Sequence, residues 1–168
     1  MGKYLKAVVP IVLIIMIIAI VFYKKENVEE PTITIKFNIS KLTEDEFNRL
    51  ERVNYEDSGI SDFRILTYKI DMKQSNGITS RKIVIPDIEK VINTIDKTRV
   101  IHMTGWEQDN AEENFANYSY EFIYYSKGLN DEDVKKALSS KVVTVSWETI
   151  NGEATTKRFN VGNLTKIK

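Results

Sequence analysis

The chain of 168 residues contains no cysteine and one histidine, His102. Without cysteine there is no disulfide, no thiol nucleophile and no cysteine-ligated zinc or iron–sulfur cluster. One histidine with no cysteine partner also argues against a transition-metal site. The composition therefore predicts no cofactor. For an exported domain, the lack of disulfides favours a bacterial envelope protein.

Glycine is scarce too, and the charge is balanced. None of the seven glycines forms the spaced pattern of a nucleotide phosphate loop. The 24 basic and 24 acidic side chains cancel, and no basic run is interleaved with aromatic residues. A nucleic-acid-binding protein would carry such a basic surface. We therefore expect no nucleic-acid partner.

One long apolar run is present, at residues 7–23, and it carries no charged side chain. As a helix it would span about 25 Å, close to the hydrocarbon thickness of about 30 Å. No small-residue cleavage site follows it, so an uncleaved anchor fits better than a signal peptide. The sequence predicts a short cytoplasmic tail at 1–6, a single transmembrane anchor in the lipid bilayer at 7–23 and a juxtamembrane linker at 24–31.

The orientation of this anchor is less strongly encoded. Two lysines precede the run and two follow it, so the count of basic side chains is level. The free amino terminus adds positive charge before the run and favours the cytoplasmic side for it. We expect an extracytoplasmic C-terminal domain at the cell membrane; a cytoplasmic domain is the alternative.

Residues 32–168 are long enough for one globular domain with its own core. Apolar periodicity and capping signals predict seven strands and about three short helices. The expected strands are 32–39, 63–73, 78–85, 99–106, 118–125, 141–148 and 153–161, and the expected helices 43–53, 88–95 and 131–138. The turn residues at 75–77 and 151–152 predict two hairpins. The fold class is α+β with a mainly antiparallel sheet; a β-sandwich with helical crossovers is the alternative.

Two features of the sequence have the residue types of a catalytic or metal site: His102 and the acidic loop that follows it. His102 alternates with apolar neighbours in a predicted strand, and no G-x-S-x-G motif accompanies it, so a structural or surface role is favoured. The loop that follows holds several carboxylates, whose oxygens suit Ca²⁺. Its spacing does not match a calcium loop and it lacks the glycine of the sharp turn, so a solvated loop is favoured. Its acidic residues are Glu107, Asp109, Glu112 and Glu113. The sequence predicts no enzyme.

The strand 118–125 is rich in tyrosine. Its alternate residues Tyr118, Tyr120, Phe122 and Tyr124 share one face. If exposed, these rings would stack on glycans or form a partner interface. If the strand is core, its apolar residues on both faces indicate that it is covered twice. The candidate interaction surface is Tyr118, Tyr120, Tyr124 and Trp106, and the sequence leaves open whether these rings lie in the core.

Together these features predict a single-pass membrane protein whose C-terminal domain binds another membrane or envelope protein without catalysis. A second hypothesis is a module for cell-wall glycans or other ligands that uses strand 118–125. A third is a membrane-tethered regulator or immunity factor with its domain in the cytoplasm.

Overall fold

The computed structural model describes residues 28–51, 55–95 and 99–168. The predicted tail and anchor lie outside these ranges, as does the first part of the predicted linker. Among the described residues, no helix is long and apolar enough to cross a bilayer. The anchor therefore stays a prediction.

The described residues form a sheet-rich α+β domain, which confirms the predicted fold class at that level. It holds eight strands, four short α-helices and one turn of 3-10 helix. In chain order these are β1 (Thr32–Lys41), α2 (Glu44–Asn48), η1 (Ile60–Asp62), β2 (Phe63–Lys73), β3 (Ile78–Val84), α3 (Ile88–Asn93), β4 (Val100–Gln108), β5 (Phe115–Tyr125), α4 (Asp131–Leu138), β6 (Val142–Thr149), β7 (Ala154–Asn160), α5 (Val161–Leu164) and β8 (Thr165–Ile167).

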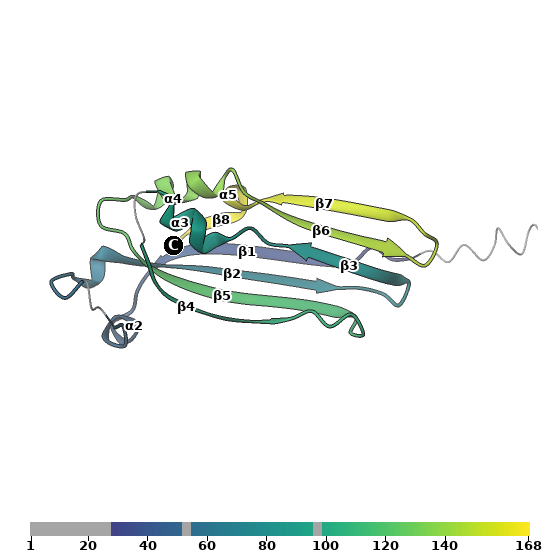
Figure 1. Cartoon of the computed structure of the whole chain (residues 1–168), viewed down its shortest axis with the longest axis horizontal. Helices are drawn as coiled ribbons and strands as arrows, with labels where there is room; N and C mark the ends of the chain where they lie inside the picture. Colours follow the sequence, from purple (N-terminus) through teal and green to yellow (C-terminus); the bar gives the residue numbers. More distant parts are fainter. Residues whose placement is uncertain (1–27, 52–54, 96–98) are drawn as a thin grey trace, which may run out of the picture.

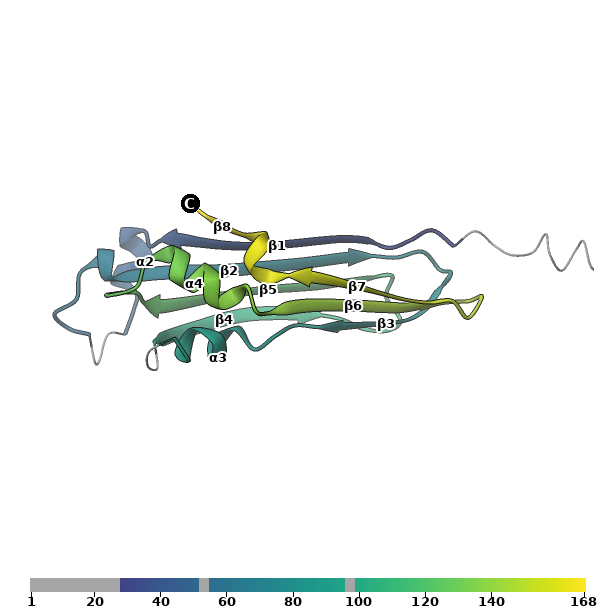
Figure 2. The same cartoon turned by 90° about the horizontal axis from the view of Figure 1, so that it is seen from above.

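Two sheets make up most of the domain. The large sheet has the strand order β4-β5-β2-β1-β8, and the small sheet has the order β3-β6-β7. The strand pairs are antiparallel except β1 with β8, which are parallel. The small sheet lies over one half of the large sheet, and α3, α4 and α5 lie over the other half of the same face (Figures 1 and 2). Where the small sheet covers the large one, the domain therefore has two stacked sheets, as in the alternative prediction of a β-sandwich.

One predicted hairpin is wrong and the other is confirmed. Strand β2 pairs with β1 on one side and with β5 on the other, so it has no free edge for β3. The turn at 75–77 therefore carries the chain into the small sheet, where β3 pairs with β6. Strands β6 and β7 do form a hairpin, and Gly152 in its turn has a φ of 75°. A glycine adopts that angle without steric cost.

Helices α2 and α3 begin at their predicted capping residues but end earlier than predicted. Helix α4 has the predicted bounds, and Asp87 caps α3 by accepting a hydrogen bond from the Lys90 amide. Thr43 and Glu46 form the reciprocal capping box at the start of α2. Helix α2 nevertheless ends at Asn48, earlier than the predicted end, and part of the predicted range lies outside the described residues. Helix α5 and strand β8 were not predicted.

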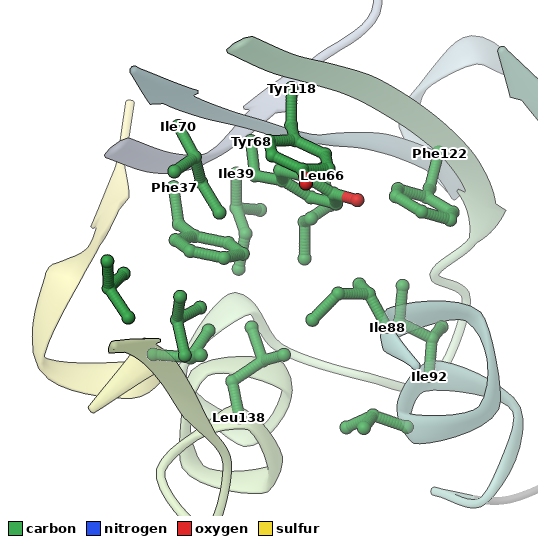
Figure 3. Packing of buried hydrophobic residues seen from close by; sticks show 14 of the residues in the cluster. Phe37, Ile39, Leu66, Tyr68, Ile70, Ile88, Ile92, Tyr118, Phe122 and Leu138 are labelled. Atoms are coloured by element: carbon green, nitrogen blue, oxygen red, sulfur yellow. The ribbon is translucent and has the colours of Figure 1, made fainter. Parts of the chain in front are cut away.

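The main core lies between the large sheet and the elements that cover it. Figure 3 shows side chains from β1, β2 and β5 facing those of α3 and α4. Ile123 and Ile65 point to the opposite face of the large sheet, where a second cluster forms with Leu42 and Phe63 beside α2. Strand β5 is therefore covered on both faces near its end, as the apolar pattern of 118–125 indicates.

Candidate functional site

The register between β4 and β5 separates the four predicted surface residues. Tyr118 pairs with Glu107, Tyr120 with Gly105, and Trp106 with Ser119. Directly paired residues share a face of the sheet, and successive residues alternate between faces. The tyrosines therefore lie on the face covered by the small sheet and the helices, and Trp106 lies on the opposite face. The structure does not bring the four residues onto one surface.

Their exposure differs as much as their direction. Tyr124 is fully buried, Tyr118 is 8% exposed and Tyr120 is half-buried. Trp106 is 55% exposed. Tyr124 therefore belongs to the core and offers no ring to a partner, whereas Tyr120 contributes part of its ring to the surface.

Tyr120 lies in a ladder of stacked rings. Its ring is 5.2 Å from that of Tyr68, with an angle of 26° between the planes, and 6.4 Å from that of Phe122. The ring also lies across Gly105 of β4, because a Cβ added at that position would overlap Tyr120. A glycine is therefore needed opposite Tyr120, and the ring covers the backbone that the glycine leaves bare.

Two carboxylates hold the hydroxyl groups of the tyrosines. The Tyr120 hydroxyl donates to Glu107 Oε2 at 3.1 Å, and the Tyr118 hydroxyl donates to Asp109 Oδ2. Burial raises the pKa of Tyr118, and the hydrogen bond to Asp109 raises it further. Burial, then the hydrogen bond to Glu107, likewise raises the pKa of Tyr120. Both phenols stay protonated at neutral pH and act as donors.

A buried arginine, which sequence reasoning missed, organises the acidic loop at 109–114. Arg81 of β3 has a side chain that is 3% exposed, and its Nε lies 2.6 Å from Asp109 Oδ1. Its two terminal nitrogens donate to the backbone oxygens of Glu113 and Asn110, each at 2.6 Å. The loop is thus tied to the small sheet. Within the described ranges, no three acidic or histidine side chains are grouped as metal ligands.

A groove of about 450 Å³ opens where the ladder meets the edge of β4. The chain from β3 into α3 forms its other wall. Its apolar lining includes Ile83, Ile85 and Met103, and its carboxylates are Asp87, Glu89 and Glu107. Among the described residues, no lysine or arginine lines this groove, which we call the inner groove. It is an open groove in which aliphatic and aromatic side chains lie beside carboxylates.

A second hollow, of about 750 Å³, lies on the other side of β4. It contains His102, Arg49 and the carboxylates of Glu46, Glu51 and Glu121. We call it the outer hollow. His102 is exposed there, on the side of β4 away from the tyrosine ladder.

Strand β4 separates these two hollows and is the last strand of the large sheet. Residues 100–106 of this strand carry no acidic or basic side chain apart from His102. Met103 is 50% exposed, and Trp106 is more exposed still. Folded proteins normally protect such an edge with charged side chains or a covering segment.

Comparisons of the chain with protein-family models, with curated proteins and with solved structures return no match. What the domain can do therefore follows from its own residues.

Proposed function

We propose that the chain is a single-pass membrane protein whose domain binds another membrane or envelope protein without catalysis. The binding surface is the edge of β4 together with the inner groove. One observation carries this proposal: an exposed strand edge, whose residues 100–106 carry no lysine, arginine or acidic side chain, lies directly beside a groove lined by apolar side chains and carboxylates. Unprotected edges and apolar patches with polar rims are typical of protein interaction sites.

The arrangement of the polar groups supports binding over catalysis. His102 lies on the opposite side of β4 from the tyrosine ladder, so the two do not form an acid–base pair. Glu107 and Asp109 each accept a hydrogen bond from a tyrosine hydroxyl, which holds them in place. The groove therefore presents hydrogen-bond acceptors and apolar contacts in fixed positions.

The domain also fits attachment through its amino-terminal end. Strand β1 begins at the end of the domain that carries the β6–β7 turn (Figure 1). An anchor at 7–23 would place this end nearest the bilayer. Strand β2 has 11 residues, and at roughly 3.3 Å per residue the sheet extends about 35 Å away from it. The edge of β4 would then face a neighbouring envelope protein laterally.

The glycan hypothesis has weaker support. Tyr118 and Tyr124 are buried, so strand 118–125 offers little ring surface to a sugar. The cytoplasmic regulator hypothesis differs in the side of the membrane and uses the same surface. Protease added to intact, wall-stripped cells separates the two, because an extracytoplasmic domain is digested and a cytoplasmic one is protected.

Affinity purification from membranes tests the proposed surface. The full chain, its Met103→Lys variant and its Ile150→Lys variant are compared in parallel. Ile150 is a matched control, because it is 59% exposed and lies at the β6–β7 turn. We expect the wild type and Ile150→Lys to retain the same partner protein and Met103→Lys to lose it. Equal recovery by all three proteins would contradict the proposed surface.

A further inference from the structure

We infer that the partner adds an extended segment to the free edge of β4, in line with the large sheet, and that this segment carries lysine or arginine. The inference rests on the proposed function, because it specifies which kind of protein segment the surface takes.

The backbone of β4 supplies the first part of the evidence. The strand is nine residues long and pairs with β5 in regular register from His102 to Gln108, after a register shift between Val100 and His102. In such a strand, every second residue directs its N–H and C=O groups away from the paired neighbour. No other strand in the described part of the chain pairs with that edge. These groups can pair with an added strand.

Among the described strands, the other sheet edges are partly covered or carry more basic side chains, which favours β4. Strand β8 covers part of the outer side of β1, at Phe37 to Ile39. The edge strand β7 carries Lys157 and Arg158, and the edge strand β3 carries the exposed Lys82. Charged side chains and covering segments oppose strand addition. Among the described residues, no strand pairs with the outer edge of β4, and its residues 100–106 carry no lysine, arginine or acidic side chain.

The charge around β4 determines which segment fits. The inner groove contributes three carboxylates, those of Asp87, Glu89 and Glu107. Among the described residues, the outer hollow contributes three more, from Glu46, Glu51 and Glu121, against one arginine. The side chains of an added strand would point alternately into the two hollows. Opposite charge favours the approach of a basic segment, whereas a second copy of this domain would bring like charges together.

The apolar side chains that line the inner groove indicate which other residues the added segment carries. Ile83, Ile85 and Met103 face the inner groove, so aliphatic side chains of the segment fit there. Basic side chains fit on the other face of the added strand, toward Glu121. The preferred segment therefore alternates aliphatic and basic residues, and its backbone hydrogen bonds extend the large sheet.

Hydrogen exchange of the full chain in detergent micelles tests this with four synthetic peptides at millimolar concentration. The first alternates valine and lysine, and the second alternates valine and glutamate. The other two are valine–lysine peptides, N-methylated either on the valines or on the lysines. In an added strand, one of these two sets of amides faces β4 and the other faces solvent.

We expect the valine–lysine peptide to slow exchange across 100–108 by about tenfold, since the new hydrogen bonds protect those amides. One N-methylated peptide should keep this effect and the other should lose it. The valine–glutamate peptide should have little effect. Met103→Lys should weaken protection, and the control Ile150→Lys should not.

The results that would contradict strand addition differ from those that would contradict the proposed binding surface. Equal protection by both N-methylated peptides would show side-chain binding without strand addition. Equal protection by the valine–glutamate peptide would overturn the basic preference, and no protection by any peptide would overturn the inference. If Met103→Lys still abolished partner recovery from membranes, the proposed surface would stand while strand addition failed.

Discussion

Replacement of Arg81 by methionine should destabilise the domain strongly. The change keeps a long side chain but removes the guanidinium that joins the small sheet to the loop at 109–114. It leaves the Asp109 carboxylate without its cation, and the backbone oxygens of Asn110 and Glu113 without their arginine donors. Breaking a buried ion pair from one side typically costs about 3–5 kcal/mol.

The structure places the expected cost near the lower end of that range. The Asp109 side chain is 26% exposed, and it keeps the hydrogen bond from Tyr118. Water can therefore replace part of what the arginine supplied. We expect the free energy of unfolding to fall by about 3 kcal/mol, and the midpoint of thermal unfolding to fall by roughly 10 °C for a domain of this size.

Guanidinium unfolding of the full chain in micelles, followed by far-UV circular dichroism, measures this change. The matched control is Lys82→Met, the next residue of β3, whose exposed side chain should contribute less than about 0.5 kcal/mol. A double-mutant cycle with Asp109→Ala should give a coupling of about 1–3 kcal/mol between the two residues. If Arg81→Met and Lys82→Met lowered stability equally, the structural role of Arg81 would be refuted.

Four further predictions concern the tyrosine ladder and its neighbours. Gly105→Ala should force the Tyr120 ring away and lower the free energy of unfolding by about 1–3 kcal/mol. This loss should shrink in part in a Tyr120→Ala background, because the added Cβ also approaches the Ser119 backbone oxygen; unfolding of the wild type, the two single variants and the double variant measures it. Tyr124→Phe should be neutral or stabilising by up to about 1 kcal/mol, because the buried hydroxyl has no hydrogen-bond partner among the described residues. Tyr118→Phe, which loses the bond to Asp109, should destabilise by about 1–3 kcal/mol in the same assay. Burial raises the pKa of Tyr68 and Tyr124 in the folded domain. The stability that these protonated phenols contribute is therefore complete below the ordinary phenol pKa of about 10 and is lost as the pH rises above it. Unfolding midpoints that stay constant above pH of about 10 would contradict this.

The local structure could largely be predicted from the sequence. The bounds of β2 and α4 match the prediction, because strand alternation and helix periodicity with a capping residue act over a few residues. Coverage of strand 118–125 on both faces also follows from its two apolar faces. These features depend on neighbours in the chain.

The topology and the site depend on distant residues and could not be predicted in the same way. The turn at 75–77 has hairpin residues, yet both edges of β2 are taken by strands from elsewhere in the chain. Arg81 contacts residues about 30 positions away, and its own strand shows only ordinary alternation. The separation of Trp106 from Tyr120 follows from the register across the loop at 109–114, which composition does not encode. Free edges and long-range ion pairs become visible only in three dimensions.

Site-specific photocrosslinking in intact cells tests the proposed binding surface most directly. A benzophenone amino acid is placed at Met103 in the full chain and, as a control, at Ile150, and the cells are irradiated. Because position 103 lies on the free edge of β4 and position 150 at the β6–β7 turn, we expect one discrete protein adduct from position 103 and none of the same mass from position 150. The same adduct from both positions, or no adduct from position 103, would contradict binding at the edge of β4.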